Sequence, residues 1–349
     1  MKPQRQWVAQ AIAKIQADIQ RSADTHLIKI DVPQFAGIDI YLKDESTHPT
    51  GSLKHRLARS LFLYALCNGK INQHTPIIEA SSGSTAISEA YFARLLGLPF
   101  IAVMAKSTSI EKINQIKAYG GECYLVPSTD LIYAQSEALA KERQGYYMDQ
   151  FTYAERATDW RGKNNIADAI FSQMRHELHP IPRHIVMSAG TGGTSATLGR
   201  YIRYHQLSTE LCVVDPENSV SYDYFLTGDQ DLKSTRCSVI EGIGRPRIEP
   251  SFIASVIDNM QSINDKASIA AMLWLEKKLG RRVGPSTGTN IMGVLNLAQK
   301  MQQEGETGSI VTLWCDRGDR YQHSYYDPNW VAEQIGDITE QQALLNAYD

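Results

Sequence analysis

The sequence has 349 residues, of which 43% are hydrophobic and 21% are charged, and its formal net charge is -3 at pH 7. These values are typical of a globular chain that is long enough for two domains or one large domain. Lys and Arg are scattered rather than gathered into the basic patch of a nucleic-acid-binding protein. No apolar stretch approaches the roughly 18 residues that span a bilayer. We therefore expect neither a nucleic acid nor a membrane as a partner.

The N-terminal stretch from Met1 to Arg21 is polar, has a helical pattern and lacks the apolar middle of a secretory signal. No pair of cysteines has CxxC spacing, and the five cysteines lie far apart at Cys67, Cys123, Cys212, Cys237 and Cys315. This pattern argues against a disulfide framework and against a zinc site. We therefore expect reduced thiols, no bound metal and a cytoplasmic location.

Short apolar runs alternate with longer amphipathic stretches in the first half of the chain. We expect strands over residues 38–42, 76–80, 100–104 and 123–126, and helices over residues 52–68, 84–96, 109–119 and 131–143. Leu53, Leu57 and Leu61, for example, recur at helical spacing, and Gly69 ends that helix. Residues 144–161 have no clear period and could form a crossing between domains.

The same alternation resumes in the second half of the chain. We expect helices over residues 163–178, 194–204, 267–279 and 291–302, and strands over residues 184–187, 211–214 and 310–314. Nearly all of the expected strands are apolar, as parallel strands are when helices cover both faces of a sheet. The pattern therefore predicts an α/β fold. The long irregular segment 217–247 is of the kind that binds or covers a ligand.

A glycine-rich turn, Gly190-Thr191-Gly192-Gly193-Thr194, joins an expected strand to an expected helix. The N–H groups of such a turn can bind a phosphate with help from the helix dipole, although a plain tight turn has the same composition. The turn lacks the lysine of a Walker loop, and Ser195 stands where a dinucleotide fingerprint needs its third glycine. It therefore favours a compact monophosphate over a nucleotide.

Lys54 is expected in the first turn of the helix over residues 52–68, directly after the turn Pro49-Thr50-Gly51. A positive charge there opposes the helix dipole, so the position favours a neutral amine, which is the form that Schiff-base chemistry needs. By itself, the same position would also suit a solvated surface lysine.

A third turn, Ala80-Ser81-Ser82-Gly83-Ser84-Thr85-Ala86, also lies between an expected strand and an expected helix. Its hydroxyl and N–H groups could bind a carboxylate. The same residues could instead form an ordinary Ser/Thr cap of the helix.

In this order, the three turns resemble those of the fold type II enzymes that use pyridoxal 5′-phosphate (PLP), and most of all the cysteine synthase group. Gly51-Ser52-Leu53-Lys54 resembles the turn that carries the family's cofactor-binding lysine. Ser81 to Ala86 resembles the family's "TSGNTG" loop, which binds the substrate carboxylate. Gly190 to Thr194 is identical to its "GTGGT" phosphate loop.

Two further segments extend the resemblance. Glu241 to Gly244 resembles the family's "GIG" segment, which lines the substrate side. Ser286 to Gly288 resembles the "SSG" segment, whose hydroxyl faces the pyridine nitrogen. The resemblance extends from about Lys43 to Cys315, which is most of the chain.

The resemblance implies a role for each matching residue. Lys54 would hold PLP as a Schiff base and would then act as the catalytic base. Further cofactor contacts would come from Ser84, Ser286 and the phosphate loop, namely Gly190, Thr191, Gly192, Gly193 and Thr194. The substrate would be bound by Ser81, Ser82, Gly83, Thr85 and Gly242.

Several residues depart from the family's pattern. Ser84 replaces the asparagine that bonds the phenolic oxygen of PLP, and Ala86 replaces a glycine. His55 follows the lysine in place of the common acidic residue. Ser286 and Thr287 both offer a hydroxyl to the pyridine nitrogen, and we prefer Ser286. With the segment EGIGRPR and an aromatic C-terminal tail, these changes resemble the L-cysteine desulfhydrase subgroup.

The resemblance implies β-elimination on L-cysteine, with pyruvate, ammonia and hydrogen sulfide as products. Cysteine synthase, which uses O-acetylserine and sulfide, is the alternative, because both reactions use every residue named above. A serine or threonine dehydratase fits the motifs less closely. A non-catalytic PLP-fold binding protein is disfavoured because Lys54 and the phosphate loop are retained.

By resemblance, the fold is that of the tryptophan synthase β-like enzymes, with two α/β domains that each contain a mainly parallel sheet covered by helices. The smaller domain would hold residues 45–160, and the larger would hold residues 1–44 and 161–349. The resemblance also implies a homodimer and a small amino acid as the substrate.

Overall fold

The computed structural model describes residues 2–236 and 238–349, which divide into two units. The first unit comprises the residues up to Asp24 together with His48–Asp159, and the second comprises Thr25–Thr47 and Trp160–Asp349. Met1 and Cys237 lie outside the described residues. The four cysteines that are described form no disulfide.

The sheet of the first unit is parallel, and its central strands β3 and β4 are buried on both faces. Its strands follow the order β5-β4-β3-β6 and are β3 (Ile77–Ala80), β4 (Phe100–Ala105), β5 (Glu122–Val126) and β6 (Tyr146–Tyr147). Successive residues face opposite sides, so that Ile77 and Ile78 belong to different apolar clusters. Burial on both faces explains why β3 and β4 have nearly continuous apolar sequences.

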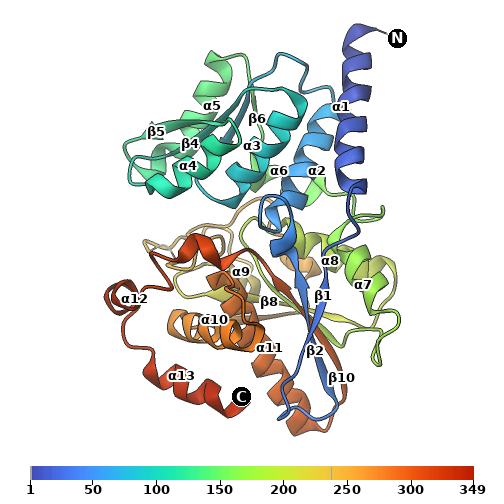
Figure 1. The fold of residues 1–349 in the computed structure, drawn as a ribbon, viewed down its shortest axis with the longest axis vertical. Helices are drawn as coiled ribbons and strands as arrows, with labels where there is room; N and C mark the ends of the chain where they lie inside the picture. The colour runs from blue at the N-terminus through green and yellow to red at the C-terminus, as the bar shows by residue number, and fades with distance from the viewer. Residues whose placement is uncertain (1, 237) are drawn as a thin grey trace. The chain divides into compact units, whose positions relative to one another are not determined.

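The helices of the first unit contribute to two apolar clusters. α5 (Ile132–Glu142) packs on β3 and β4 and adds Leu139 and Ala140 to one cluster (Figure 1). The other cluster contains residues of α1 (Pro3–Gln20), α2 (Lys54–Cys67), α3 (Ser84–Leu96), α4 (Ile110–Ala118) and α6 (Gln150–Ala157).

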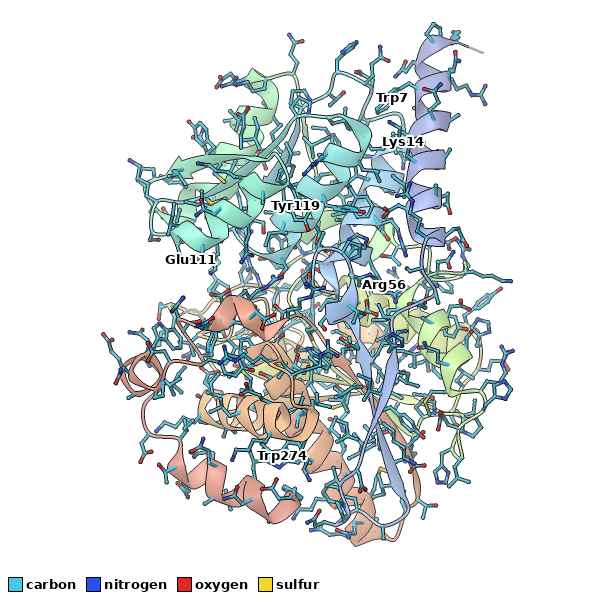
Figure 2. The ribbon with its side chains drawn as sticks, in the orientation of Figure 1. Trp7, Lys14, Arg56, Glu111, Tyr119 and Trp274 are labelled. Atoms are coloured by element: carbon cyan, nitrogen blue, oxygen red, sulfur yellow. The ribbon has the colours of Figure 1, made fainter. Side chains whose placement is uncertain are left out.

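α1 belongs to the first unit, whereas the sequence predicts all of residues 1–44 in the larger domain. Ala11 and Ile15 of α1 are buried in the cluster that α2 and α3 also form, and Trp7 packs against that cluster (Figure 2). The sequence could not place α1, because an amphipathic helix needs an apolar partner but its pattern does not identify which one.

The sheet of the second unit is parallel except at one edge. Its order is β1-β2-β10-β7-β8-β9, and β1 is antiparallel to β2. The strands are β1 (Leu27–Ile30), β2 (Ile38–Asp44), β7 (His184–Ser188), β8 (Glu210–Pro216), β9 (Asn259–Ile263) and β10 (Gly308–Trp314). β2 pairs with β10 in the register Ile38 to Gly308, so strands from the two ends of the chain lie side by side.

A long helix, α11 (Pro285–Glu304), packs on most strands of this sheet, and α10 (Asp265–Leu279) packs on α11 (Figure 1). Trp274 of α10, marked in Figure 2, is buried in this core. The remaining helices are α7 (Ile166–Met174), α8 (Gly193–Tyr204), α9 (Ser221–Thr227), α12 (Pro328–Gln334) and α13 (Thr339–Leu345).

The expected α/β fold, with two mainly parallel sheets covered by helices, is therefore confirmed. Every helix and strand expected from the sequence is present, although the helix expected over residues 291–302 begins at Pro285. Short elements such as β6, α6 and β9 were not expected, because a few residues show no clear period. Among the described residues, none of the helices combines the length and the apolar character needed to cross a bilayer.

Candidate active site

Lys54 is the first residue of α2, in the turn that the sequence predicted. The N–H of Gly51 donates to the carbonyl oxygen of His48 over 2.8 Å, and the N–H of Lys54 donates to Ser52 Oγ over 3.3 Å. The N-cap residue, Leu53, makes no side-chain cap. Ser52 Oγ is thus the neutral acceptor at the positive end of the helix dipole, and Lys54 lies in the first turn.

Thr50 connects the turn that precedes Lys54, here called the lysine turn, to α3 by a side-chain hydrogen bond. Its Oγ1 lies 2.9 Å from Ser88 Oγ and 3.2 Å from Nδ1 of His55. The buried imidazole of His55 also stacks on His48, with 5.0 Å between ring centroids, and its Nε2 lies 3.9 Å from Asp18 Oδ2. His55, which departs from the family's pattern, thus helps to fix the position of Lys54 relative to α3.

The hydroxyl-rich turn leads from β3 into α3. Ser81, Ser82, Gly83 and Ser84 are half-buried, and Thr85 is buried. Ser81 Oγ accepts the N–H of Gly83 over 3.2 Å. The N-cap of α3 is Gly83, which has no capping side chain, so the alternative of an ordinary Ser/Thr cap is wrong. The N–H groups of the first turn of α3 are thereby suited to an anion such as a carboxylate.

Gln150 joins this turn, although sequence reasoning did not identify it. Thr85 Oγ1 donates to Gln150 Oε1 over 2.7 Å, and both side chains are buried. Because the amide oxygen accepts from Thr85, the Nε2 group of Gln150 is left as a donor. The two residues are 65 positions apart and lie on different helices, so no spacing rule could have paired them.

The glycine-rich turn leads from β7 into α8 and depends on backbone geometry. Gly192 is the N-cap of α8 and has a φ of 86°, and a Cβ there would lie 2.5 Å from the carbonyl oxygen of Ser251. Only glycine fits this position. The N–H of Gly193 donates to Thr191 Oγ1 over 3.3 Å, and the following N–H groups of the first turn have no helical acceptor. This arrangement suits a phosphate.

The structure also brings the segment with Gly242 against this turn. A Cβ added at Gly190 would lie 2.3 Å from the carbonyl oxygen of Gly242. The N–H of Gly244 donates to the carbonyl oxygen of Ala189 over 3.2 Å. The predicted phosphate loop and the predicted "GIG" segment, which are about fifty residues apart in the sequence, are therefore neighbours.

Ser286 and Thr287 lie in the first turn of α11, and both are buried. Thr287 Oγ1 accepts the N–H of Cys315 over 3.1 Å, so this hydroxyl is used within the protein. Ser286 makes no such contact to the described part of the chain. The difference supports Ser286 as the hydroxyl that meets a ligand.

These groups fit PLP. Taken one by one, the uncapped N-terminus of α8 suits a phosphate, Lys54 carries an amine of the kind that binds an aldehyde, and Ser286 carries a hydroxyl that can bond a ring nitrogen. The turns before α3 and α8 follow the carboxyl ends of β3 and β7, where α/β folds bind ligands. The fold and these turns define the class of fold type II PLP enzymes.

Comparison with known proteins agrees with this class. A family model described as "Pyridoxal-phosphate dependent enzyme" matches residues 20–316, and the chain belongs to this family. An L-cysteine desulfhydrase of Mycobacterium tuberculosis is 58% identical, over 95% of this chain and 91% of its own length. A cysteine synthase of Aquifex aeolicus is 30% identical, over 83% of this chain and 84% of its own length.

Among solved structures, a hydrogen sulfide-producing enzyme from Fusobacterium nucleatum has a TM-score of 0.76 and 25% identity. The match covers 87% of this chain and 97% of that enzyme. The expectation of a PLP-dependent enzyme is therefore confirmed. The roles of individual residues, from Lys54 to Ser286, stay predictions.

Proposed function

We propose that the protein is an L-cysteine desulfhydrase, which releases hydrogen sulfide, ammonia and pyruvate from L-cysteine by β-elimination. The observation that carries this proposal is the 58% identity to the desulfhydrase of M. tuberculosis over 95% of the chain. The Fusobacterium enzyme, which produces hydrogen sulfide on a similar fold, adds support. Cysteine synthases are similar at a lower identity, 30% for that of A. aeolicus, and so support the alternative less.

We propose that Lys54 holds PLP covalently and that the N–H groups of residues 190–194 bind its phosphate. Ser286 Oγ would bond the pyridine nitrogen, and Ser84 Oγ the phenolic oxygen. When bound, PLP draws electrons from the α-carbon of an amino acid and so makes its α-proton easier to remove.

The chain's own groups then bind the substrate and move a proton. The turn Ser81–Thr85 and the N-terminus of α3 would bind the carboxylate, with Gln150 Nε2 as a further donor and Gly242 at the substrate side. The amine of Lys54, once released, would remove the α-proton as a general base. Its place in the first turn of α2 favours the neutral amine that a base requires.

The test is to add L-cysteine alone to the purified, PLP-loaded protein and to measure sulfide and pyruvate together. We expect equal amounts of both over many turnovers. If neither product forms, but O-acetylserine and sulfide yield cysteine, the enzyme is a synthase and the proposal is wrong. A protein that shows no visible absorbance after incubation with PLP would instead support a non-catalytic binding protein.

We also propose that the enzyme is a cytoplasmic homodimer. The absence of a disulfide among the four described cysteines is consistent with a reducing compartment. The homodimer rests on the family resemblance alone. Light scattering of the PLP-loaded protein should give twice the mass of one chain, and a monomer mass at all concentrations would contradict it.

A further inference from the structure

Two glutamates near the hydroxyl-rich turn are completely buried. Glu79 lies in β3, just before the turn, and Glu89 lies in α3, just after it. Both residues are 0% exposed. Burying even one carboxylate is costly unless it is hydrogen-bonded or neutralised, so two together need a physical reason.

The two carboxyl groups differ in their hydrogen bonds. Glu79 Oε1 accepts the N–H of Ala80 over 2.7 Å, and its Oε2 accepts the N–H of Gln150 over 3.2 Å. Within the described part of the chain, neither oxygen of Glu89 has a hydrogen-bond partner if Glu89 is a carboxylate. A proton on one Glu89 oxygen removes half of this deficit, because the resulting hydroxyl can donate to Glu79.

Electrostatics favours a pair that is protonated. Burial raises the pKa of Glu79, and the charge of Asp149 raises it further, whereas the two backbone N–H groups lower it. Burial and the charge of Glu79 raise the pKa of Glu89 well above its ordinary value. The titratable groups that face the pair are Asp149, before α6, and Tyr147 on β6, whose own pKa burial also raises. The pair therefore keeps at least one proton at neutral pH.

Gln150 connects this pair of glutamates to the hydroxyl-rich turn. Its N–H donates to Glu79, while its side-chain Oε1 accepts from Thr85 Oγ1. Glu79 therefore fixes the backbone at the residue whose side chain orients Thr85. All of these groups belong to the first unit.

We propose that Glu89 is a positioning residue for substrate binding. As a neutral acid it donates to Glu79, which in turn holds Gln150 so that Gln150 and Thr85 meet the substrate carboxylate. When alkaline conditions remove the shared proton, two negative charges lie together in a buried site, and this support of Gln150 is lost. The assignment of L-cysteine as substrate rests on the proposed function, whereas the shared proton does not.

Three variants of the PLP-loaded protein test the proposal. Glu89→Gln keeps a hydrogen-bond donor that cannot be lost at alkaline pH. Glu89→Leu removes the donor and leaves Glu79 alone. Glu142→Gln, at an exposed position at the end of α5, is the control for the loss of one glutamate. For each we would measure kcat and KM for L-cysteine from neutral to alkaline pH, and the Kd for L-alanine, an amino acid without a leaving group.

We expect Glu89→Leu to raise both the KM for L-cysteine and the Kd for L-alanine about tenfold, with kcat changed less than about threefold, as for a lost buried hydrogen bond that serves binding. Glu89→Gln should match the wild type at neutral pH. It should also lack part of the alkaline rise in KM that the wild type shows. Substrate ionisation is the same for all variants, so only differences between their profiles are compared.

Thermal unfolding provides a readout that does not depend on activity. Carboxyl groups with raised pKa values hold protons that the unfolded chain releases, so stability falls as pH rises from about 4.5, their ordinary value, through the raised pKa. Glu89→Gln has one such group fewer, so its Tm should fall less steeply than that of the wild type. Glu142→Gln should follow the wild type.

Unchanged KM, Kd and pH profiles in both Glu89 variants would overturn the proposal. A flatter Tm profile without any effect on binding would also overturn it, because the pair would then exist without positioning Gln150. If the wild type binds L-alanine but releases no sulfide from L-cysteine, the proposed function is wrong, and the Kd comparison still tests Glu89. If Glu89→Leu does not fold, the pH profiles of Glu89→Gln decide.

Discussion

The two units hold their candidate residues in different ways. In the second unit, the phosphate loop is made of backbone, and the space around Gly190 and Gly192 is too small for a side chain. In the first unit, side chains that contact one another hold the predicted turns, Thr85 with Gln150 at the hydroxyl-rich turn and Thr50 with Ser88 at the lysine turn. A backbone site depends on a few local residues, whereas a side-chain network depends on distant ones. Variants in the two units should therefore fail in different ways.

Lys54→Ala should have the largest effect, a loss of at least about 10³-fold in kcat for sulfide release, because we propose that the amine is both the covalent anchor of PLP and the base. The phosphate loop lies in the other unit and is untouched, so the variant should still bind PLP without a covalent bond. Sulfide release, and PLP retained after dialysis, measure the two effects. Turnover near the wild-type rate would show that another group is the base.

Gly192→Ala should weaken PLP binding by about 100-fold, because the residue combines a positive φ with a contact that leaves no room for a methyl group. Gly228→Ala is the matched control, since Gly228 has a φ of 73° but nothing within 4 Å of an added Cβ. Fluorescence titration with PLP would give the Kd for PLP of each variant. Equal PLP affinity in the two variants would contradict the steric argument at Gly192.

Gln150→Ala should raise the KM for L-cysteine about tenfold while PLP affinity stays unchanged, because the donor Nε2 and the partner of Thr85 are both lost. Gln73→Ala, at an exposed position in the same unit, controls for removal of an amide. Steady-state kinetics with the PLP-loaded variants provides the measurement. If Gln150→Ala raises the Kd for PLP and not the KM for L-cysteine, the first unit does not serve substrate binding separately from cofactor binding, and the comparison fails.

Ser286→Ala should have the smallest effect, a loss of about three- to tenfold in kcat and a shift in the visible absorbance of the bound cofactor, with little change in Tm. Thr287→Ala should leave the visible absorbance of the cofactor unchanged and should instead lower stability. The loss of stability should be about 1–3 kcal/mol, because the N–H of Cys315 loses its acceptor in a buried region. If Thr287→Ala shifts the absorbance and Ser286→Ala does not, the assignment of the two hydroxyls is reversed.

The same contrast explains what the sequence could predict. α3 was expected over its observed range, because Gly83 and Gly97 border a continuous helical pattern. The glycine-rich turn between β7 and α8 was also expected at its observed place, because its constraints lie in five consecutive residues. Gln150 was missed because α6 is short and its partner Thr85 is 65 residues away. Glu89 was missed for a related reason, since a helical pattern gives no sign that a glutamate will be buried.

The pairing of β2 with β10 has a consequence for how the protein is made. The first unit needs nothing beyond Asp159, whereas β2, near the N-terminus, pairs on one side with a strand that begins at Gly308. A nascent chain therefore exposes an unpaired edge of β2 until most of the second unit has left the ribosome. The second unit therefore completes its sheet only after nearly the whole chain has been made, whereas the sheet of the first unit is complete once Tyr147 has been added.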